Sequence, residues 1–221
     1  GSKGIKKKNL RKVNGKPLIY YPISDAVKSK VIDHIVVSTD DKKIAKAAKS
    51  YGATIPFMRP KSLAGDLSTT EDGLKHALIN YEKLIKKKFK YCVYLGATDI
   101  FRDVNWIKKG LKILKNEKKI ESVFSGHVVH KNFWEKKKGR WTRLRPWMKK
   151  YSSRQIRQKI IREDTALTCV SRAHLWRKGR RIGDKVKIIE NNDILTSLEI
   201  HDRKDLKIVN KLFKMRLKKE I

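Results

Sequence analysis

Apolar residues along this chain alternate between two spacings, one typical of strands and one typical of helices. Runs of adjacent apolar residues predict strands at 34–40, 53–58, 91–95, 122–125, 166–170 and 186–189. Apolar residues three and four positions apart predict helices over 18–30, 41–51, 69–84, 103–114 and 202–218. Strands that alternate with helices in this way indicate a single α/β domain with a doubly wound, mostly parallel sheet.

The polar residues that follow these strands are expected to share one rim of the sheet. In a doubly wound sheet the ligand lies beyond the carboxyl ends of the strands. The loops after Asp40, Met58 and Leu95 would therefore meet at one place. Asp99 lies in the last of these loops, where a carboxylate could take up magnesium, and a simple turn aspartate would give the same pattern.

The alternating pattern stops between residues 127 and 165. Many lysines and arginines lie there around four large aromatic residues, which are Phe133, Trp134, Trp141 and Trp147. Because these aromatic residues are out of register with the core of the sheet, the segment predicts an inserted arm that packs on a second copy of the chain. We expect one domain over residues 1–221, with 127–165 as its dimerisation arm.

The charge of the chain is strongly positive. Lysine and arginine number 56 against 22 acidic residues, which gives a formal net charge of +34. Such a balance is common among nucleic-acid-binding proteins, but here the lysines are spread over nearly every element and no RNA-binding motif accompanies them. We expect a lysine-biased composition that suits anionic substrates and no specific nucleic acid. Arg180 and Arg181 could meet a phosphate, although a solvated turn is the simpler interpretation.

The location is predicted from what the chain lacks. It has no apolar run long enough to span a membrane and no signal peptide, so no membrane partner is expected. Cys92 and Cys169 lie in apolar, strand-like segments, which favours buried free thiols in a reducing compartment. These observations predict a cytoplasmic protein.

The first fifteen residues carry the clearest sign of chemistry. The loop begins Gly-Ser-Lys-Gly, continues through a run of lysines to Asn9, and leads to a turn at Asn14–Gly15. Gly1 and Gly4 would let the backbone approach a ligand, and its amides with Lys8 would make a cradle for a polyphosphate. A solvated, lysine-rich loop is the alternative.

Several spaced motifs then occur in order. After the opening loop come Ser38-Thr39-Asp40-Asp41, Tyr51-Gly52-Ala53, Arg59-Pro60 and Leu63-Ala64-Gly65-Asp66. Together they resemble the acylneuraminate cytidylyltransferases, the CMP-sialic acid synthetase family, closely over residues 1–78 and more loosely beyond. The resemblance implies a Rossmann-like nucleotidyltransferase domain. It also implies that CTP and an acidic sugar give a CMP-sugar and pyrophosphate, with Mg²⁺, in a homodimer.

The resemblance also assigns roles to particular positions. It implies that CTP is bound by the opening loop, by the arginine before Pro60 and by the polar segment after Asp66, which gives Ser2, Lys3, Gly4, Lys8, Asn9, Arg59, Ser68 and Thr70. Lys8 would also be catalytic, because nucleotidyl transfer needs the charge of the triphosphate neutralised. Arg154 and Gln155 would bind the carboxylate of the sugar.

The sequence departs from the family pattern at four places, three of which concern the sugar and the metal. The apolar strand that opens the family is absent before Gly1, and the family's sugar-contacting glutamine is Gly96 here. The family's metal-binding pair of aspartates is Glu199 and His201 here, and its sugar segment is rewritten at 164–168. We therefore expect a metal site of Glu199, Asp99 and His201, in which Asp99 is catalytic and replaces the lost carboxylate.

Three other functions fit the sequence. A nucleotidyltransferase of the same fold could use another sugar. The altered metal pair would also suit a catalytically inactive relative, and the net charge would suit a basic nucleic-acid-binding protein.

Overall fold

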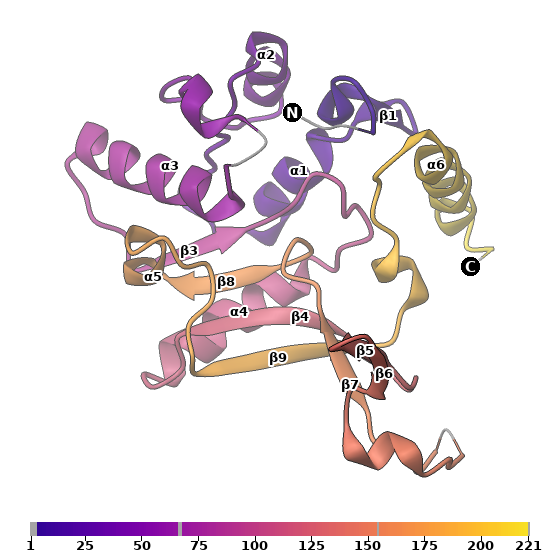
Figure 1. Ribbon diagram of the computed structural model, residues 1–221. Helices are drawn as coiled ribbons and strands as arrows, with labels where there is room; N and C mark the ends of the chain where they lie inside the picture. The colour runs from indigo at the N-terminus through magenta and orange to yellow at the C-terminus, as the bar shows by residue number, and fades with distance from the viewer. Residues whose placement is uncertain (1–3, 66–67, 154, 221) are drawn as a thin grey trace.

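The structure is a computed structural model that describes residues 4–65, 68–153 and 155–220 (Figure 1). Its α-helices are α1 (Tyr20–Ser29), α2 (Lys42–Ser50), α3 (Thr70–Ile85), α4 (Asn105–Asn116), α5 (Ala173–Arg177) and α6 (Arg203–Leu217). Its strands are β1 (Lys12–Val13), β2 (Lys16–Pro17), β3 (Tyr91–Tyr94), β4 (Ser122–Val129), β5 (Trp134–Lys137), β6 (Arg140–Arg143), β7 (Ile160–Glu163), β8 (Cys169–Arg172) and β9 (Val186–Asn191). Short 3₁₀ helices are η1 (Lys8–Leu10), η2 (Lys61–Leu63), η3 (Pro146–Lys149) and η4 (Ile194–Ser197).

The central sheet has five strands in the order β3-β8-β4-β7, with β9 on the other edge of β4. Strands β3, β4 and β9 run in one direction, while β8 and β7 run in the opposite direction. The predicted α/β class is therefore confirmed, and three of the five strands of this sheet share one direction. One difference from the expected order is that β8 lies antiparallel between β3 and β4, so most neighbouring pairs in this sheet are antiparallel.

Two of the predicted strands are wrong. Residues 34–40 and 53–58 are extended but share only one parallel bridge, between Val36 and Thr54. At this bridge the amide of Val37 donates to the carbonyl of Thr54, and the amide of Thr54 donates to the carbonyl of Ile35. An apolar run indicates that a segment is buried, but not that it pairs with another strand. Here the apolar side chains of the two segments pack on α1 and α2.

Helices α2 and α3 begin at polar capping residues. The Asp41 side chain accepts from the amides of Lys43 and Ile44 at the start of α2. Thr69 and Asp72 form a reciprocal capping box at the start of α3. The turn at Asn14–Gly15 is also confirmed: both residues have positive φ, 44° and 76°, as a two-residue hairpin between β1 and β2 requires.

The core brings the two ends of the chain together. One buried cluster joins hairpin β1–β2, α1, the loop after β3 and α6; it contains Val13, Leu18, Tyr21, Ile100, Phe101, Ile200 and Val209. A second cluster packs α4 against β4, β8 and β9, behind the sheet in Figure 1. The first cluster positions the opening loop beside residues 199–201, which is the basis of the site.

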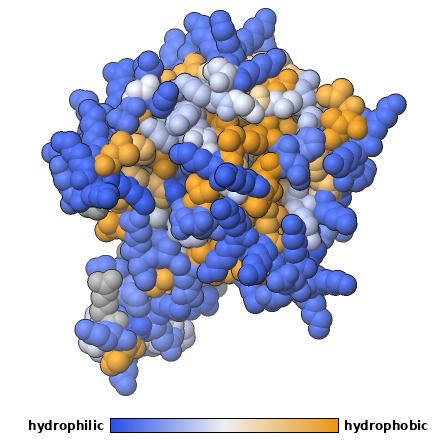
Figure 2. Space-filling model, turned by 180° about the vertical axis from the view of Figure 1, so that it is seen from behind, coloured by the Kyte–Doolittle hydropathy of each residue, from blue (hydrophilic) through white to orange (hydrophobic). Residues whose placement is uncertain are grey.

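The segment predicted as an arm extends away from the body of the molecule (Figure 1). It consists of the hairpin β5–β6, η3 and the return strand β7, which pairs with the end of β4. Met148 is fully buried beneath this hairpin, whereas Trp141 is 66% exposed and Ile156 is 76% exposed. Away from the arm, hydrophilic side chains cover most of the back of the molecule with apolar residues between them (Figure 2). Dispersed lysines give this appearance.

Candidate active site

The opening loop packs against the segment that precedes α6. The Lys8 ammonium donates to the carbonyl of Ile200 at 2.9 Å. A Cβ atom on Gly4 would clash with the carbonyl oxygen of His201, so only glycine allows the loop to approach this closely. Two predicted nucleotide-binding residues, Gly4 and Lys8, are thus brought to the predicted metal-binding residues, although the two groups lie far apart in sequence.

Two carboxylates meet beside this contact. The Thr98 hydroxyl lies 3.0 Å from Asp99 Oδ2 and 3.3 Å from Glu199 Oε1, so it bridges the two side chains. Burial, and then the nearby charge of Glu199, raise the pKa of Asp99 to about 6. His201 Nε2 lies 3.2 Å from the other oxygen of Glu199. The Thr98 hydroxyl therefore joins Asp99 and Glu199, and His201 contacts Glu199 from its other oxygen.

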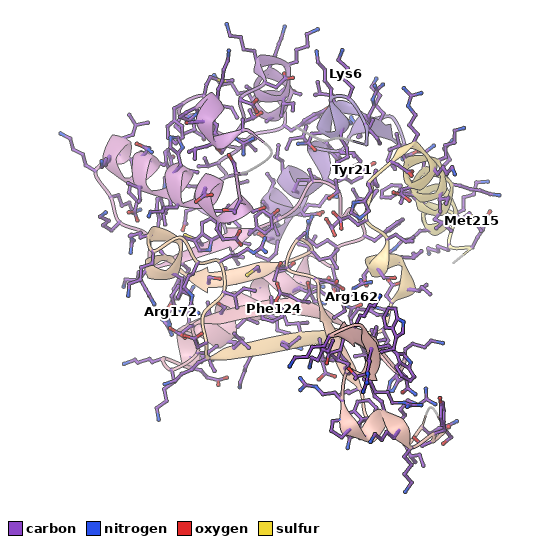
Figure 3. The ribbon with its side chains drawn as sticks, in the orientation of Figure 1. Lys6, Tyr21, Phe124, Arg162, Arg172 and Met215 are labelled. Atoms are coloured by element: carbon purple, nitrogen blue, oxygen red, sulfur yellow. The ribbon has the colours of Figure 1, made fainter. Side chains whose placement is uncertain are left out.

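These side chains line a cleft of about 430 Å³. Its wall is acidic, since Asp99, Glu163, Asp164, Glu199 and Asp205 all contribute to it. Arg162, labelled in Figure 3, is the one arginine of the lining and binds Asp164 with two hydrogen bonds of 2.7 and 2.9 Å. Arg162 thus neutralises Asp164. Among the residues that line this cleft, no arginine binds Asp99 or Glu199 through two hydrogen bonds, so their negative charges repel each other.

This pair suits a hard divalent cation in part. Magnesium binds proteins through one or two carboxylates and completes its shell with water and substrate phosphates. Among residues 4–65, 68–153 and 155–220, no three His, Cys, Asp or Glu side chains are arranged to hold a metal ion by themselves. A cation between Asp99 and Glu199 would relieve their repulsion, so the donor set fits magnesium bound together with a polyphosphate.

A second group of predicted residues lies at the start of α3. Arg59 forms an ion pair with Asp40 at 3.4 Å, and its guanidinium lies next to Gly73 in the first turn of the helix. The Arg59 Nε atom is buried without a hydrogen-bond partner. The Ser68 hydroxyl donates to the carbonyl of Ser62, and Thr70 is the first residue of α3. Arg59, Ser68 and Thr70 are therefore close to the same helix end.

Tyr94 lies between the two groups. Burial raises the pKa of this phenol, Arg181 lowers it, and Asp99, Glu71 and Glu199 raise it further, so carboxylates from both groups are close to it. Arg181 lies over the Tyr94 ring at 5.0 Å and pairs with Glu71 at 3.4 Å. The predicted solvated turn fits Arg180, which pairs with Asp184. Arg181 instead turns inward. In the sequence, Tyr94 at the end of an apolar run was the one sign of its contact with Arg181.

The remaining predicted site residues are not all in this region. Asn9 lies beside Lys8 in η1, and its carbonyl accepts from the amide of Ile19. Gln155 is exposed on the arm, which in Figure 1 extends away from the body of the molecule. Ser2, Lys3 and Arg154 lie outside the described residues, so their predicted roles stay predictions.

Comparisons with known proteins identify the family of the chain. A family model described as cytidylyltransferase matches residues 1–168. The chain belongs to the cytidylyltransferase family. This membership confirms the resemblance seen in the sequence motifs, and it makes the chain a nucleotidyltransferase by family.

Relatives and solved structures extend the family match. The chain is 29% identical over 217 residues to post-translational flagellin modification protein B of Campylobacter coli, covering 97% of this chain and 91% of that protein. It is 41% identical over 98 residues to the CMP-N,N'-diacetyllegionaminic acid synthase of Campylobacter jejuni, covering 44% and 42%. It thus spans most of the first relative and less than half of the second.

Structural similarity covers nearly the whole chain. A CMP:2-keto-3-deoxy-manno-octonic acid synthetase in complex with CTP matches with a TM-score of 0.69 over 98% of this chain and 95% of that one, at 13% identity. A 4-diphosphocytidyl-2C-methyl-D-erythritol synthase from Anaerococcus prevotii matches with a TM-score of 0.65. At such low identity these matches show a shared fold, and they confirm the Rossmann-like α/β prediction. Within the described part of this cytidylyltransferase-family chain, every helix is too short or too polar to cross a membrane.

Proposed function

We propose that this chain transfers the CMP group of CTP to an acidic sugar and releases pyrophosphate. The observation that carries the proposal is the contact of Lys8 with Ile200, which places the opening loop against the Asp99–Glu199 pair in a member of the cytidylyltransferase family. Nucleotidyl transfer requires a neutralised triphosphate and a hydroxyl held in line with the α-phosphorus. Lys8, which binds the carbonyl next to Glu199, and the carboxylate pair of the cleft supply both signs of charge for that task.

The proposed sugar class comes from the named relatives. Besides the legionaminic acid enzyme, a pseudaminic acid cytidylyltransferase of Campylobacter jejuni is 35% identical over 54% of this chain. An N-acylneuraminate cytidylyltransferase of Escherichia coli is 33% identical over 57% of it. Each of these names describes an enzyme for an acidic sugar, which supports an acidic sugar here. The proposed nucleotide is CTP, bound by Gly4, Lys8 and Asn9 of the opening loop and by Arg59 at the start of α3.

We also propose Mg²⁺ as the metal, held by Asp99 and Glu199. When bound, the cation would neutralise the developing charge on the phosphates. His201 would orient Glu199 rather than bind the metal, because imidazole is a poor ligand for magnesium. Both cysteines are free, which supports a reducing, cytoplasmic setting for the reaction.

A homodimer is proposed from the arm. Six of its large apolar side chains, at positions between 133 and 156, are exposed by 38% to 76%. A second copy would cover them, and the same contact would carry Gln155 and its neighbours toward an active site. Such a contact would give Gln155, which is exposed and outside the cleft lining, a place at the partner's site.

The test is pyrophosphate release by the chain with CTP and a panel of acidic sugars. Asp99→Asn and Glu199→Gln should each lower magnesium-dependent turnover by at least about a hundredfold, because the loss of a metal ligand removes several kcal/mol of charge stabilisation. Asp184→Asn is the matched control, since Asp184 is exposed and paired with Arg180. Intact turnover in Asp99→Asn would show that Asp99 is only a turn residue. No turnover by the unaltered chain with any acidic sugar would favour an inactive relative.

A further inference from the structure

Arg102 is a buried arginine whose contacts all lie behind the cleft. Burial lowers the pKa of its guanidinium, and the charge of Asp25 on α1 opposes that effect. The Arg102–Asp25 ion pair is 2.8 Å long, with the arginine side chain fully buried and the aspartate 15% exposed. A buried charge of this kind is costly unless every donor is satisfied, so the groups that accept from it are held firmly.

Those groups belong to two separate loops. Arg102 Nη2 donates to the carbonyls of Gly96 and Ala166, each at 2.9 Å, and Nε donates to the carbonyl of Leu167. The first carbonyl is in the loop after β3 that carries Asp99. The other two are in the turn before β8 that follows Asp164. One guanidinium therefore ties together the two loops that supply carboxylates to opposite parts of the cleft wall.

The junction between these loops has no spare room. The Gly96 amide donates to the carbonyl of Ala166 at 2.6 Å. A Cβ atom on Gly96 would lie 2.8 Å from the Ala166 side chain and 3.1 Å from Asp99 Oδ2. The carboxylate of Asp99 is thus packed against the backbone that Arg102 holds. A small shift of either loop would move this carboxylate relative to Glu199, which is fixed by a different element.

We propose that Arg102 is a positioning residue that sets the separation of the Asp99 and Glu199 carboxylates. Its guanidinium is engaged by Asp25 and by these carbonyls, and it acts through the backbone of residues 96 and 166–167. The inference rests on the proposed function only in assigning these carboxylates to the metal. Its structural part, the clamp between the two loops, stands without that assignment.

A second arginine offers a matched control. Arg172, at the other end of β8, also donates to three carbonyls, those of Leu114, Ile120 and Glu117, at 2.8 to 3.2 Å. Figure 3 shows Arg172 and Arg162 at opposite ends of the sheet, so Arg172 does the same structural work far from the cleft. Arg102→Lys and Arg172→Lys should both lower thermal stability. Only the change at Arg102 should alter the cleft.

The experiment compares both variants by amide hydrogen exchange and steady-state kinetics. Arg102→Lys should speed exchange of the Gly96 amide by at least about tenfold, because local opening becomes easier. It should also raise the KM for Mg²⁺ by at least about tenfold while the KM for CTP changes less than about twofold. Arg172→Lys should leave both unchanged. A purely structural residue would change all kinetic constants together or none.

Two outcomes would overturn the proposal: unchanged exchange at Gly96 in Arg102→Lys, or the same kinetic changes in Arg172→Lys. If Arg102→Lys does not fold, Asp25→Asn carries the test, since it removes the counter-charge of Arg102 and should give the same pattern more weakly. If the unaltered chain has no turnover, the proposed function fails, but hydrogen exchange still decides whether Arg102 holds the two loops together.

Discussion

At the scale of single residues, the site depends on Asp99. Its position in a loop after a strand was predictable, because the apolar run of β3 ends at residue 94 and polar residues follow. Its proximity to Glu199 was proposed from the sequence only through the family resemblance. The Thr98 bridge could not be predicted, because it joins side chains 101 positions apart in the chain. The two loops held by Arg102 could not be predicted either, because that contact depends on backbone carbonyls that every sequence has.

The pKa of Asp99 gives a prediction about stability. A carboxyl whose pKa rises from 3.8 to about 6 on folding binds its proton more tightly in the native state. The native state therefore loses stability as pH rises between those values, by about 3 kcal/mol when the loss is complete. Asp99→Asn should be more stable than the unaltered chain at pH 7.5 by up to that amount, and equal to it near pH 4.

Urea unfolding of both proteins without metal, at each pH, measures this difference. Asp184→Asn serves as the control, because the Asp184 pKa is lowered by Arg180 and its loss should destabilise the protein slightly. A difference between Asp99→Asn and the unaltered chain that does not change with pH would contradict the prediction.

At the scale of elements, the helices were predicted well and the strands less well. Polar residues that precede an apolar periodic segment cap three helices: Asp41, Thr69 and Asp202. Strand pairing depends on partners far along the chain, and residues 34–40 form only one bridge, between Val36 and Thr54. The arm hairpin was recognised only as an irregular segment, since exposed β5 and β6 have no core face to pattern.

The cap of α6 also reaches the site. Asp205 Oδ2 accepts from the amides of His201 at 2.8 Å and of Asp202 at 2.9 Å, so the helix start fixes the segment that carries Glu199. Asp205→Ala should cost about 1 kcal/mol of stability and also raise the KM for Mg²⁺. Asp41→Ala, which removes the cap of α2, should cost a similar amount and leave that KM unchanged. Equal kinetic effects in the two variants, after thermal melts confirm equal stability loss, would refute a role for the α6 cap.

At the scale of the whole molecule, two predictions concern association, one through the arm and one through the net charge. Trp141 is 66% exposed on β6, and we expect a second copy to cover it. Trp141→Glu should convert a dimer to a monomer at micromolar concentration, measured by sedimentation velocity. Leu84→Glu, at a residue 60% exposed on α3, should leave the dimer intact. If the unaltered chain is itself a monomer at this concentration, the prediction is wrong.

The charge of +34 predicts nonspecific attraction to polyanions rather than recognition. Binding to a duplex DNA or RNA should be insensitive to sequence and should weaken steeply with salt, because released counterions drive it. Fluorescence anisotropy with two unrelated duplexes between 50 and 200 mM salt would measure both properties. Tight, sequence-selective binding at the higher salt would instead support the nucleic-acid-binding alternative.

The contact between Lys8 and Ile200 also has a consequence for how the protein folds. The two residues are 192 positions apart in the chain, so this contact closes one of the longest loops the protein contains. Long-range contacts form late, because the entropy of closing such a loop is lost before the contact is gained. During synthesis the sheet strands β3 to β8 leave the ribosome before residue 200 does, and the opening loop waits without its partner. We therefore expect the candidate site to form late in folding, because a chain that ends before residue 199 lacks both Glu199 and the carbonyl that accepts from Lys8.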